Sequence, residues 1–258
     1  MMFMKTKESI QSENAAKFHA QHDDVFGRIA HRYDFLCDLF SFGIHRFWKQ
    51  RVAGMIAKES WTRFLDCATG TGDVVLRILN QKDLQADQTI IASDLSPQML
   101  AIAQKRLYHY RHPVAYQVLD AHSMPTVASE SVDLYSISLA LKICERNLVL
   151  QEAMRVLRPG GRLVILEASN IPQAWLHQLY LIYMKRCMPV IGWLATSGDT
   201  SAYSYLLKGI ESFPSAEILA EELLNLGFED IAFERLTLGI VAIHVARKPR
   251  SGDKERTA

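Results

Sequence analysis

The sequence lacks the short motifs that mark metal-binding and disulfide-rich proteins. Its four cysteines, Cys37, Cys67, Cys144 and Cys187, are scattered without a CxxC pair, and its nine histidines form no HExxH or His/Cys ligand pattern. No basic segment followed by an apolar run precedes the cysteines, so no secretory signal is indicated. We therefore expect reduced thiols, no bound metal and a cytoplasmic location.

The sequence also lacks an excess of charge and a clean membrane span. Its 29 Lys and Arg residues balance 28 Asp and Glu residues, giving a formal net charge of +1, so nothing in the charge favours nucleic acid as a partner. The longest apolar stretch, 175–194, is interrupted by Lys185, Arg186 and Pro189, whereas a span of about 20 residues carries few or no charges. We expect one or two amphipathic helices there.

What the sequence does contain is an alternation of short β-branched runs with helical segments, which is typical of βαβ units on a parallel sheet. Strands are predicted at 63–68, 89–94, 114–119, 132–138, 162–166, 231–235 and 240–246. Helices are predicted at 73–80, 97–109, 146–157 and 215–226, the third being stopped by the Pro-Gly-Gly cluster at 159–161. The last two strands, joined at Gly239, must form an antiparallel hairpin because their link is too short for a crossover.

These elements predict a single α/β domain over residues 25–248. The flanking segments 1–24 and 249–258 are polar with few apolar anchors, so we expect disordered tails at both ends.

The sharpest local signal is the segment 64–73, FLDCATGTGD, in which a buried strand runs into a glycine turn that opens a helix. Gly70 and Gly72 allow a ligand to approach the backbone, and the helix start offers free N–H groups. A dinucleotide-binding loop would have a third glycine, whereas here Asp73 follows Gly72 directly. A carboxylate in that place would repel a diphosphate and suit a sulfonium, which favours S-adenosylmethionine over a nicotinamide or flavin.

Further candidate ligands stand at the ends of the next strands. Asp94 can accept both ribose hydroxyls, although it could instead cap the helix that begins near Pro97, a task that Ser96 could also perform. Asp120 can accept the adenine amino group beside the small Ala121, or it is an ordinary turn residue. Ser138 ends the fourth strand, with satisfaction by the backbone as its alternative.

The order of these motifs resembles the ubiquinone/menaquinone biosynthesis C-methyltransferase family from about residue 25 to 248. The most specific likeness is VFGRIAHRYD at 25–34 followed by SFGIHRFWK at 41–49. Further matches are LRPGGR at 157–162, DTSAYSYL at 199–206 and LTLGIVAIH at 236–244.

The resemblance implies a Rossmann-like class I methyltransferase fold, with a mostly parallel seven-stranded sheet, helices on both faces and an antiparallel C-terminal hairpin. It also implies that Thr71, Asp94, Asp120, Ala121 and Ser138 contact S-adenosylmethionine. Together with the glycine loop, the predicted cofactor-binding residues are Asp66, Gly70, Thr71, Gly72, Asp94, Leu95, Asp120, Ala121 and Ser138.

One departure from the family concerns the acceptor side. After the fourth strand the family has Phe-Gly-Leu-Arg-Asn, whereas this chain has LALKI at 139–143, so that Lys142 and Ile143 replace the Arg-Asn pair. Lys142 is our candidate for a cation that stabilises an ionised hydroxyl, the alternative being a solvated lysine. His45 is a candidate base or a packed core histidine, and Tyr33 is the third predicted catalytic residue.

The acceptor itself is expected to be small and apolar. The segment 25–60 should form a helical cap over the cofactor, and the aromatic-rich insertion 170–212 should form a lid that suits a prenylated ring, a membrane surface or a dimer interface. The favoured function is methylation of a demethylated quinol at a ring carbon. The alternatives are transfer to oxygen or nitrogen of another phenolic or lipid molecule, and an inactive scaffold that binds the cofactor.

Overall fold

A computed structural model describes the chain at residues 30–81, 83–110, 112, 114–196 and 201–250. The expected N-terminal tail 1–24 lies outside the described residues, as do 251–258 of the expected C-terminal tail. Two of the segments that carry the family resemblance, 25–34 and 199–206, are described only in part.

Seven strands form one sheet in the order β3-β2-β1-β4-β5-β7-β6. Their bounds are β1 (Arg63–Cys67), β2 (Thr89–Asp94), β3 (Val114–Val118), β4 (Val132–Ser138), β5 (Leu157–Ala168), β6 (Glu229–Leu236) and β7 (Val241–Arg247). Strands β1 to β5 pair in parallel, while β7 is antiparallel to both β5 and β6. The predicted mostly parallel sheet with a C-terminal hairpin is therefore confirmed, and the strand order reverses between β1 and β4, where open α/β sheets bind ligands.

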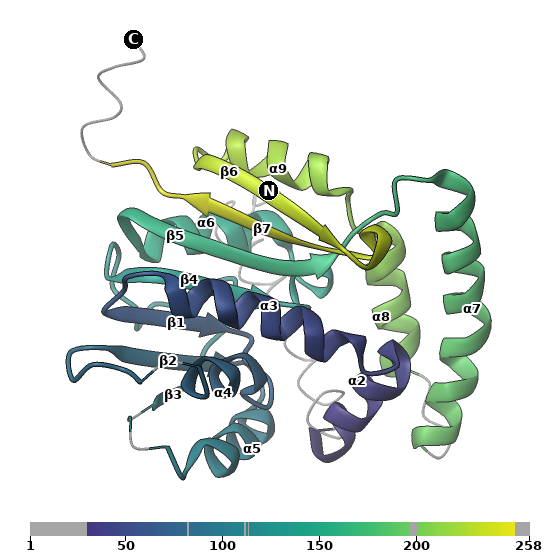
Figure 1. The fold of residues 1–258 in the computed structure, drawn as a ribbon, viewed down its shortest axis with the longest axis horizontal. Helices are drawn as coiled ribbons and strands as arrows, with labels where there is room; N and C mark the ends of the chain where they lie inside the picture. The colour runs from purple at the N-terminus through teal and green to yellow at the C-terminus, as the bar shows by residue number, and fades with distance from the viewer. Residues whose placement is uncertain (1–29, 82, 111, 113, 197–200, 251–258) are drawn as a thin grey trace, which may run out of the picture.

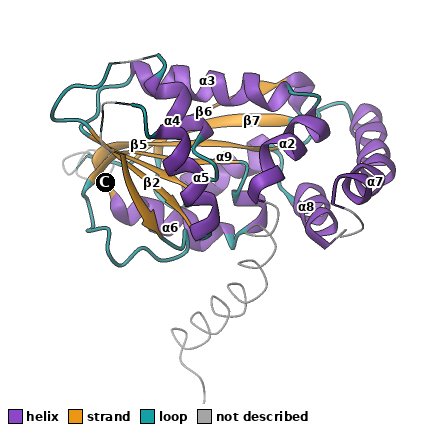
Figure 2. Ribbon diagram, turned by 90° about the horizontal axis from the view of Figure 1, so that it is seen from below, coloured by secondary structure: helices purple, strands orange, loops and turns teal. Residues whose placement is uncertain are grey.

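Helices cover both faces of this sheet (Figure 2). The α-helices are α2 (Tyr33–Ser41), α3 (Ile44–Lys58), α4 (Asp73–Leu79), α5 (Pro97–Leu107), α6 (Arg146–Val156), α7 (Ala174–Thr196), α8 (Ser201–Ser212) and α9 (Ala216–Asn225). Short 3-10 turns are η1 (Ala30–Arg32), η2 (Leu141–Ile143) and η3 (Thr237–Gly239).

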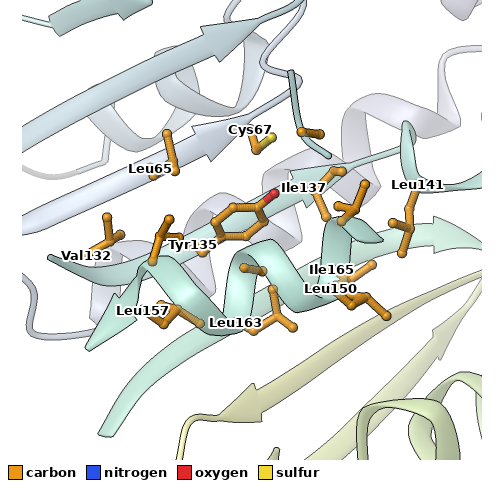
Figure 3. Packing of buried hydrophobic residues seen from close by; sticks show 14 of the residues in the cluster. Leu65, Cys67, Val132, Tyr135, Ile137, Leu141, Leu150, Leu157, Leu163 and Ile165 are labelled. Carbon is orange, nitrogen blue, oxygen red and sulfur yellow. The ribbon is translucent and has the colours of Figure 1, made fainter. Parts of the chain in front are cut away.

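Alternation along the strands divides the buried residues into two cores. In β1, Leu65 belongs to the core that α6 and α9 cover, whereas Phe64 belongs to the core that α3 and α4 cover. Figure 3 shows the first core, in which Tyr135 lies among aliphatic side chains from β4, β5 and α6. With both faces buried, the central strands read as apolar runs, which is why their positions could be predicted closely.

The Pro-Gly-Gly cluster at 159–161 follows the end of helix α6, but it lies within a strand and not in a turn. Helix α6 ends at Val156, and β5 begins directly at Leu157 and runs through the cluster to Ala168, far beyond the predicted 162–166. The cluster instead forms an irregularity in the pairing with β4, because Val132 pairs with Leu157 and Leu134 with Arg162. The helix therefore ends within one residue of the predicted bound, and the prediction that was wrong is the start of the strand at 162.

Helices α7 and α8 stand together beside the end of the sheet toward which β5 points (Figure 1). Helix α7 covers the predicted amphipathic segment as one helix with Pro189 inside it, and it packs on α8 and on α2. The rings of Phe42 and Tyr183 lie 6.4 Å apart across that contact. In the described part of the chain no helix combines the length and the apolar character needed to cross a membrane.

Candidate functional site

The carboxyl ends of β1 to β4 enclose a cavity of about 120 Å³, which we call the cleft; its lining is mainly apolar and carries a few polar groups. Six residues that the sequence marked as cofactor ligands line it, namely Gly70, Asp94, Leu95, Asp120, Ala121 and Ser138. Tyr33 from α2, Met99 from α5 and Ile143 from η2 complete its walls. The fold therefore brings together residues up to 68 positions apart on β-strand ends, counted from Gly70 to Ser138.

The backbone at the cleft adopts conformations that ordinary residues rarely take. Ala68 after β1 has φ 52° and Leu139 after β4 has φ 58°, both in the left-handed region. Each such non-glycine residue costs on the order of 1–3 kcal/mol and is held there by its surroundings, a feature that clusters at ligand sites. Both residues line the cleft, so its two central strands end in strained turns.

The two glycines of the loop have different tasks. At Gly70, where φ is 58°, an added Cβ would meet nothing within 4 Å, so the space above the loop is open. At Gly72, an added Cβ would lie 3.1 Å from Cβ of Ala103 and 3.2 Å from Leu107 in α5. Gly72 therefore serves helix packing and lines neither the cleft nor a neighbouring cavity, while Gly70 leaves room for a ligand.

Asp94 is held by backbone donors on both sides of the cleft. Its Oδ2 accepts the Gly70 N–H at 2.8 Å, and its Oδ1 accepts the Ser96 N–H at 2.9 Å. The alternative that Asp94 caps α5 is wrong, because Ser96 is the N-cap and its Oγ accepts the Met99 N–H. Burial raises the pKa of Asp94 despite hydrogen bonds from the backbone of Ser96, Gly70 and Leu95, and these three donors leave part of the acceptor capacity of the carboxylate for a ligand.

Asp120 is oriented by a histidine that the sequence did not point to. The Glu145 N–H donates to Nε2 of His122 at 3.0 Å, so the imidazole carries its proton on Nδ1 and donates it to Asp120 Oδ1 at 2.6 Å. The His122 N–H also donates to Oδ1 at 3.0 Å. The carboxylate is thus fixed at the wall of the cleft next to Ala121.

Ser138 offers a buried hydroxyl to the cleft. Its Oγ is shielded from solvent and has no hydrogen-bond partner among the described residues, so the alternative of satisfaction by the backbone is not what the structure shows. It also lines a narrow recess that adjoins the cleft, together with Gly70, Thr71, Asp66 and Lys49. A buried polar atom without a partner is costly, and a ligand in the cleft would supply one.

Asp66 lies in this recess and is one of the most buried charged residues of the molecule. Its carboxylate accepts hydrogen bonds from Thr69 Oγ1 at 2.7 Å and from Ser136 Oγ at 2.5 Å, and it is 1% exposed. Burial outweighs these hydrogen bonds and raises the pKa of Asp66 to about 6. Through Thr69, Asp66 is therefore hydrogen-bonded to the turn between β1 and α4.

The expected repulsive role of Asp73 is not supported. The carboxylate contacts three cations at 3.3 Å each, Lys49, Arg77 and Arg106, and it lines neither the cleft nor the recess. Burial alone would raise the pKa of Asp73, but these cations outweigh it and leave the pKa lowered. Because its charge is compensated, Asp73 does not give the cleft a net negative field.

Thr71 is tied to the N-terminal helix instead of facing the main cleft. Its hydroxyl donates to Asp34 Oδ1 at 2.8 Å, and Arg106 contacts the other oxygen of Asp34 at 3.0 Å. Thr71 is 2% exposed and lines only the recess. This link between α2 and the glycine loop was missed, since no sequence pattern joins residues so far apart.

A second, apolar cavity of about 530 Å³ lies beside the cleft, and we call it the apolar cavity. Its walls come from α2, α3, α7 and η3, with Ile210 from α8. Tyr33 and Leu139 line both spaces, so the cleft and the apolar cavity meet at these residues. Among its lining residues, those with chemistry for an acceptor are Tyr33, His45, Lys142 and Glu167.

His45 is both packed in the interior and part of the wall of the apolar cavity. It is 5% exposed, and burial followed by the charge of Lys49 lowers its pKa to about 4. Ser41 Oγ donates to the Cys37 carbonyl and lies 2.8 Å from Nδ1 of His45. Nδ1 therefore carries the proton of the imidazole, and Nε2 is its basic nitrogen.

Tyr33 sits where the two spaces meet. The charge that Cys37 can carry, together with burial, raises the pKa of Tyr33 well above its ordinary value. The phenol therefore keeps its proton at neutral pH, and it can act as a hydrogen-bond donor but not as a base.

Lys142 is buried, so the alternative of a solvated lysine is wrong. Its side chain is 7% exposed, and Nζ donates to Glu167 Oε1 at 3.0 Å and to the Leu139 carbonyl. The backbone N–H of Lys142 donates to the other oxygen of Glu167 at 3.0 Å. Glu167 was missed by our sequence reasoning, although an acidic residue in the apolar run LVILEA was a signal for it.

The described residues contain no group of three or more His, Cys, Asp or Glu side chains arranged to hold a metal ion.

Comparison with known proteins agrees with this geometry. Residues 13–248 match the ubiE/COQ5 methyltransferase family. The chain is 36% identical over 236 residues to the ubiquinone/menaquinone biosynthesis C-methyltransferase UbiE of Rubrivivax gelatinosus, covering 91% of this chain and 89% of that protein. It is 34% identical over 245 residues to the mitochondrial 2-methoxy-6-polyprenyl-1,4-benzoquinol methylase of Caenorhabditis elegans, covering 93% and 82%.

Solved structures show the same fold. A SAM-dependent methyltransferase of Thermotoga maritima, described as a possible histamine N-methyltransferase, superimposes with a TM-score of 0.62 at 17% sequence identity. The match covers 88% of this chain and 99% of that chain. At this identity the likeness supports the fold alone and does not identify the methyl acceptor.

Proposed function

The chain belongs to the ubiE/COQ5 methyltransferase family, and we propose that it transfers the methyl group of S-adenosylmethionine to a ring carbon of a demethylated quinol. The observation that carries the proposal is that the cleft, which holds the carboxylates of Asp94 and Asp120, meets the apolar cavity at Tyr33 and Leu139. A methyl donor with polar groups and an acceptor ring with an apolar tail require two such spaces in contact. Methyl transfer is an in-line displacement, so holding the two reactants in line provides much of the rate enhancement.

The residues of the cleft fit S-adenosylmethionine. The Asp94 carboxylate suits a ribose hydroxyl as a further donor, and the Asp120 carboxylate beside Ala121 suits an adenine amino group next to a flat ring. The unpartnered Ser138 hydroxyl and the open space over Gly70 remain for the amino-acid part of the cofactor. When bound, S-adenosylmethionine supplies an electrophilic methyl group on a sulfonium sulfur.

The protein must then make the ring carbon nucleophilic. A ring carbon of a quinol attacks readily only when a neighbouring hydroxyl has lost its proton. His45 is neutral near pH 7, because its pKa is about 4. So weak a base can take that proton at Nε2 only where the Lys142 ammonium lowers the pKa of the acceptor hydroxyl itself. Lys142 can donate an N–H to the resulting oxyanion. The ring carbon would bond to the methyl group as the bond from that group to sulfur breaks; the carbon's own proton would then pass to water, and the oxygen would take back the proton held by His45 as the ring regains aromaticity.

The helices around the apolar cavity exclude water from this reaction. In this proposal α2 and α3, within the segment 25–60, form the cap, and α7 and α8, within 170–212, form the lid. Phe42, Leu179 and Leu238 line the cavity and are 73%, 54% and 70% exposed, so they form an apolar rim at its opening. We propose that this rim touches the membrane surface, where prenylated quinols reside.

The rim has a direct test. The protein should float with vesicles of phosphatidylcholine and phosphatidylglycerol, and Phe42→Ser combined with Leu238→Ser should reduce flotation several-fold. Light scattering on the same samples distinguishes a dimer interface, because in that case the double variant would become monomeric and flotation would not change.

The activity is tested by product analysis. Purified protein is incubated with methyl-labelled S-adenosylmethionine and either a short-chain demethylmenaquinol or a simple catechol, and the position of the label is determined by NMR. We expect label on a ring carbon of the quinol. Label only on oxygen would exclude the quinol proposal and favour a phenolic acceptor, while binding without any product would favour a scaffold.

A further inference from the structure

A buried ion pair lies on the acceptor side of the site. One of its residues, Glu167, belongs to none of the family motifs given above. Glu167 is 1% exposed and ends the apolar part of β5, and Lys142 follows β4 on η2. Both side chains line the apolar cavity. Burying an ion pair among apolar walls costs several kcal/mol in desolvation, so its presence needs a reason other than stability.

The carboxylate of Glu167 accepts three hydrogen bonds that fix its position. Oε1 accepts from Lys142 Nζ at 3.0 Å and from the Ala168 N–H at 2.7 Å, while Oε2 accepts from the Lys142 N–H at 3.0 Å. Glu167 therefore accepts hydrogen bonds from both the side chain and the backbone of Lys142. A residue held at two points has little freedom to move its ammonium group.

The ammonium group of Lys142, in contrast, has one N–H donor that lacks an acceptor among the described residues. It has three N–H donors, of which one goes to Glu167 and one to the Leu139 carbonyl. No other acceptor for it lies among the described residues, although the side chain is only 7% exposed and lines the cavity. A buried donor without an acceptor is destabilising, and an oxyanion in the cavity would supply the missing acceptor.

A third contact keeps the turn that carries Lys142 in place. Helix α8 packs on η2, and a Cβ added at Gly209 would lie 2.8 Å from the carbonyl oxygen of Lys142. That is closer than a side chain and a backbone atom can approach. The absence of a side chain at Gly209 thus allows α8 to close directly on the lysine.

From these contacts we infer that Glu167 is a positioning residue, which holds the Lys142 ammonium so that its remaining N–H meets the ionised hydroxyl oxygen of the acceptor. The inference rests on the proposed function and deepens it. It assigns the acceptor class as molecules with a hydroxyl group next to the carbon that receives the methyl group, and it makes Glu167 act through Lys142 alone.

A double-mutant cycle tests this dependence. Lys142→Met should lower kcat about 100-fold, the usual effect of losing one donor to an oxyanion, with the Kd of S-adenosylmethionine unchanged. Glu167→Gln should lower kcat about 10- to 100-fold, because an ammonium that has lost its counter-charge in an apolar site moves away from its position. The double variant should be no slower than Lys142→Met. Losses that multiply in the double variant would overturn the inference.

A spectroscopic readout separates positioning from structural support. 4-Nitrocatechol changes its absorbance on ionisation, so its pKa can be titrated while it is bound. The wild-type protein should favour the ionised form about tenfold relative to water, and Lys142→Met and Glu167→Gln should both abolish this preference. Equal ionisation in all three proteins would overturn the inference even if the variants were slow.

Two further variants keep the test valid if Glu167→Gln does not fold. Gly209→Ala displaces Lys142 through its backbone and should lower kcat about tenfold, whereas Gly54→Ala in α3 meets only the end of the Gln81 side chain at 3.4 Å and should change nothing. Glu222→Gln, which breaks a partly exposed ion pair with Arg146, is the control for losing a carboxylate. An unaffected Gly209→Ala variant would contradict the inference.

The proposed function and the role of Glu167 can be disproved separately. If the wild-type protein neither binds S-adenosylmethionine nor methylates carbon, the proposed function fails. If it methylates carbon while Glu167→Gln and Gly209→Ala match the wild-type protein, only the inference fails.

Discussion

The cleft and the apolar cavity are adjacent, yet they are built in different ways. The cleft is formed by residues that directly follow parallel strands and are fixed by short hydrogen bonds, such as those from Gly70 and Ser96 to Asp94. The apolar cavity is formed by helices from both ends of the chain, which hold one another mainly by side-chain packing. The cleft therefore has the rigidity of the sheet, whereas the apolar cavity has the adaptability of a packed helical surface.

Substitutions in the two regions should therefore have different effects. Changes in the cleft should alter the affinity for S-adenosylmethionine and leave the acceptor side intact. Changes around the apolar cavity should alter turnover or acceptor choice while the cofactor still binds. Tyr33, Leu139 and Ile143 lie at or near the boundary, and only there do we expect both properties to change together.

Asp94→Ala should have the largest effect and tests the cleft alone. It removes the acceptor for the ribose hydroxyls and the anchor of the Gly70 N–H, and hydrogen bonds to a charged group contribute about 1.5–3 kcal/mol each. We expect the Kd for S-adenosylmethionine, measured by isothermal titration calorimetry, to rise at least 100-fold. Asp87→Ala, on an exposed loop, is the matched control. Tight binding by Asp94→Ala would separate this carboxylate from the cofactor.

His45→Gln should have the next largest effect and tests the apolar cavity. Removal of a general base lowers rates about 100-fold or more, so kcat for the quinol should fall by that factor while the Kd for S-adenosylmethionine stays constant. Because the pKa of His45 is about 4, the wild-type rate should not fall between pH 8 and pH 6 through protonation of this residue. A wild-type rate that falls with an apparent pKa near 6.5 would contradict the assigned state of His45.

Asp66→Asn tests the support beneath the cleft through stability. The pKa of Asp66 is raised to about 6 from 3.8, so the folded state binds its proton more tightly than the unfolded state does. The ionised carboxylate therefore destabilises the fold fully above pH 6, and this cost disappears as the pH falls toward 3.8. We expect Asp66→Asn to be more stable than the wild-type protein by about 1–3 kcal/mol at pH 8 in urea denaturation.

The control for this measurement is the pH dependence itself. The difference in the free energy of unfolding between Asp66→Asn and the wild-type protein should shrink between pH 6 and pH 4.5. A variant that is less stable than the wild-type protein at pH 8 would show that the hydrogen bonds from Thr69 and Ser136 need the charge.

The sequence predicted the cleft more completely than the apolar cavity, for a physical reason. A strand that ends in a polar residue leaves a local pattern, so Asp94, Asp120 and Ser138 could be selected without knowing which strands are neighbours. The interaction of Thr71 with Asp34 joins α2 to the glycine loop and has no local pattern. For Asp73 the local pattern was misleading, because its charge is compensated by Lys49 and Arg106 from distant helices.

The apolar cavity was predicted only as a lid of unspecified arrangement. Its composition depends on how α2, α3 and α7 pack, which periodicity along one segment cannot reveal. Lys142 was selected because it departs from the family pattern, whereas Glu167 was not, although it is the residue that holds it. The start of β5 ahead of the Pro-Gly-Gly cluster was not predicted, because its pairing with β4 depends on a register that the sequence does not give.

Ser138→Ala should have the smallest effect and sharpens the comparison most finely. The Oγ atom is buried without a partner in the described structure, so its removal should leave the free energy of unfolding unchanged or raise it slightly. If a cofactor atom fills that role in the complex, the Kd for S-adenosylmethionine should rise about three- to tenfold, the effect of one hydrogen bond. Ser136→Ala is the matched control on the same strand, because its hydroxyl donates to Asp66 and its loss should lower stability. An unchanged Kd for Ser138→Ala would mean that the hydroxyl faces empty space, and the cleft would then owe its affinity to Asp94 and Asp120.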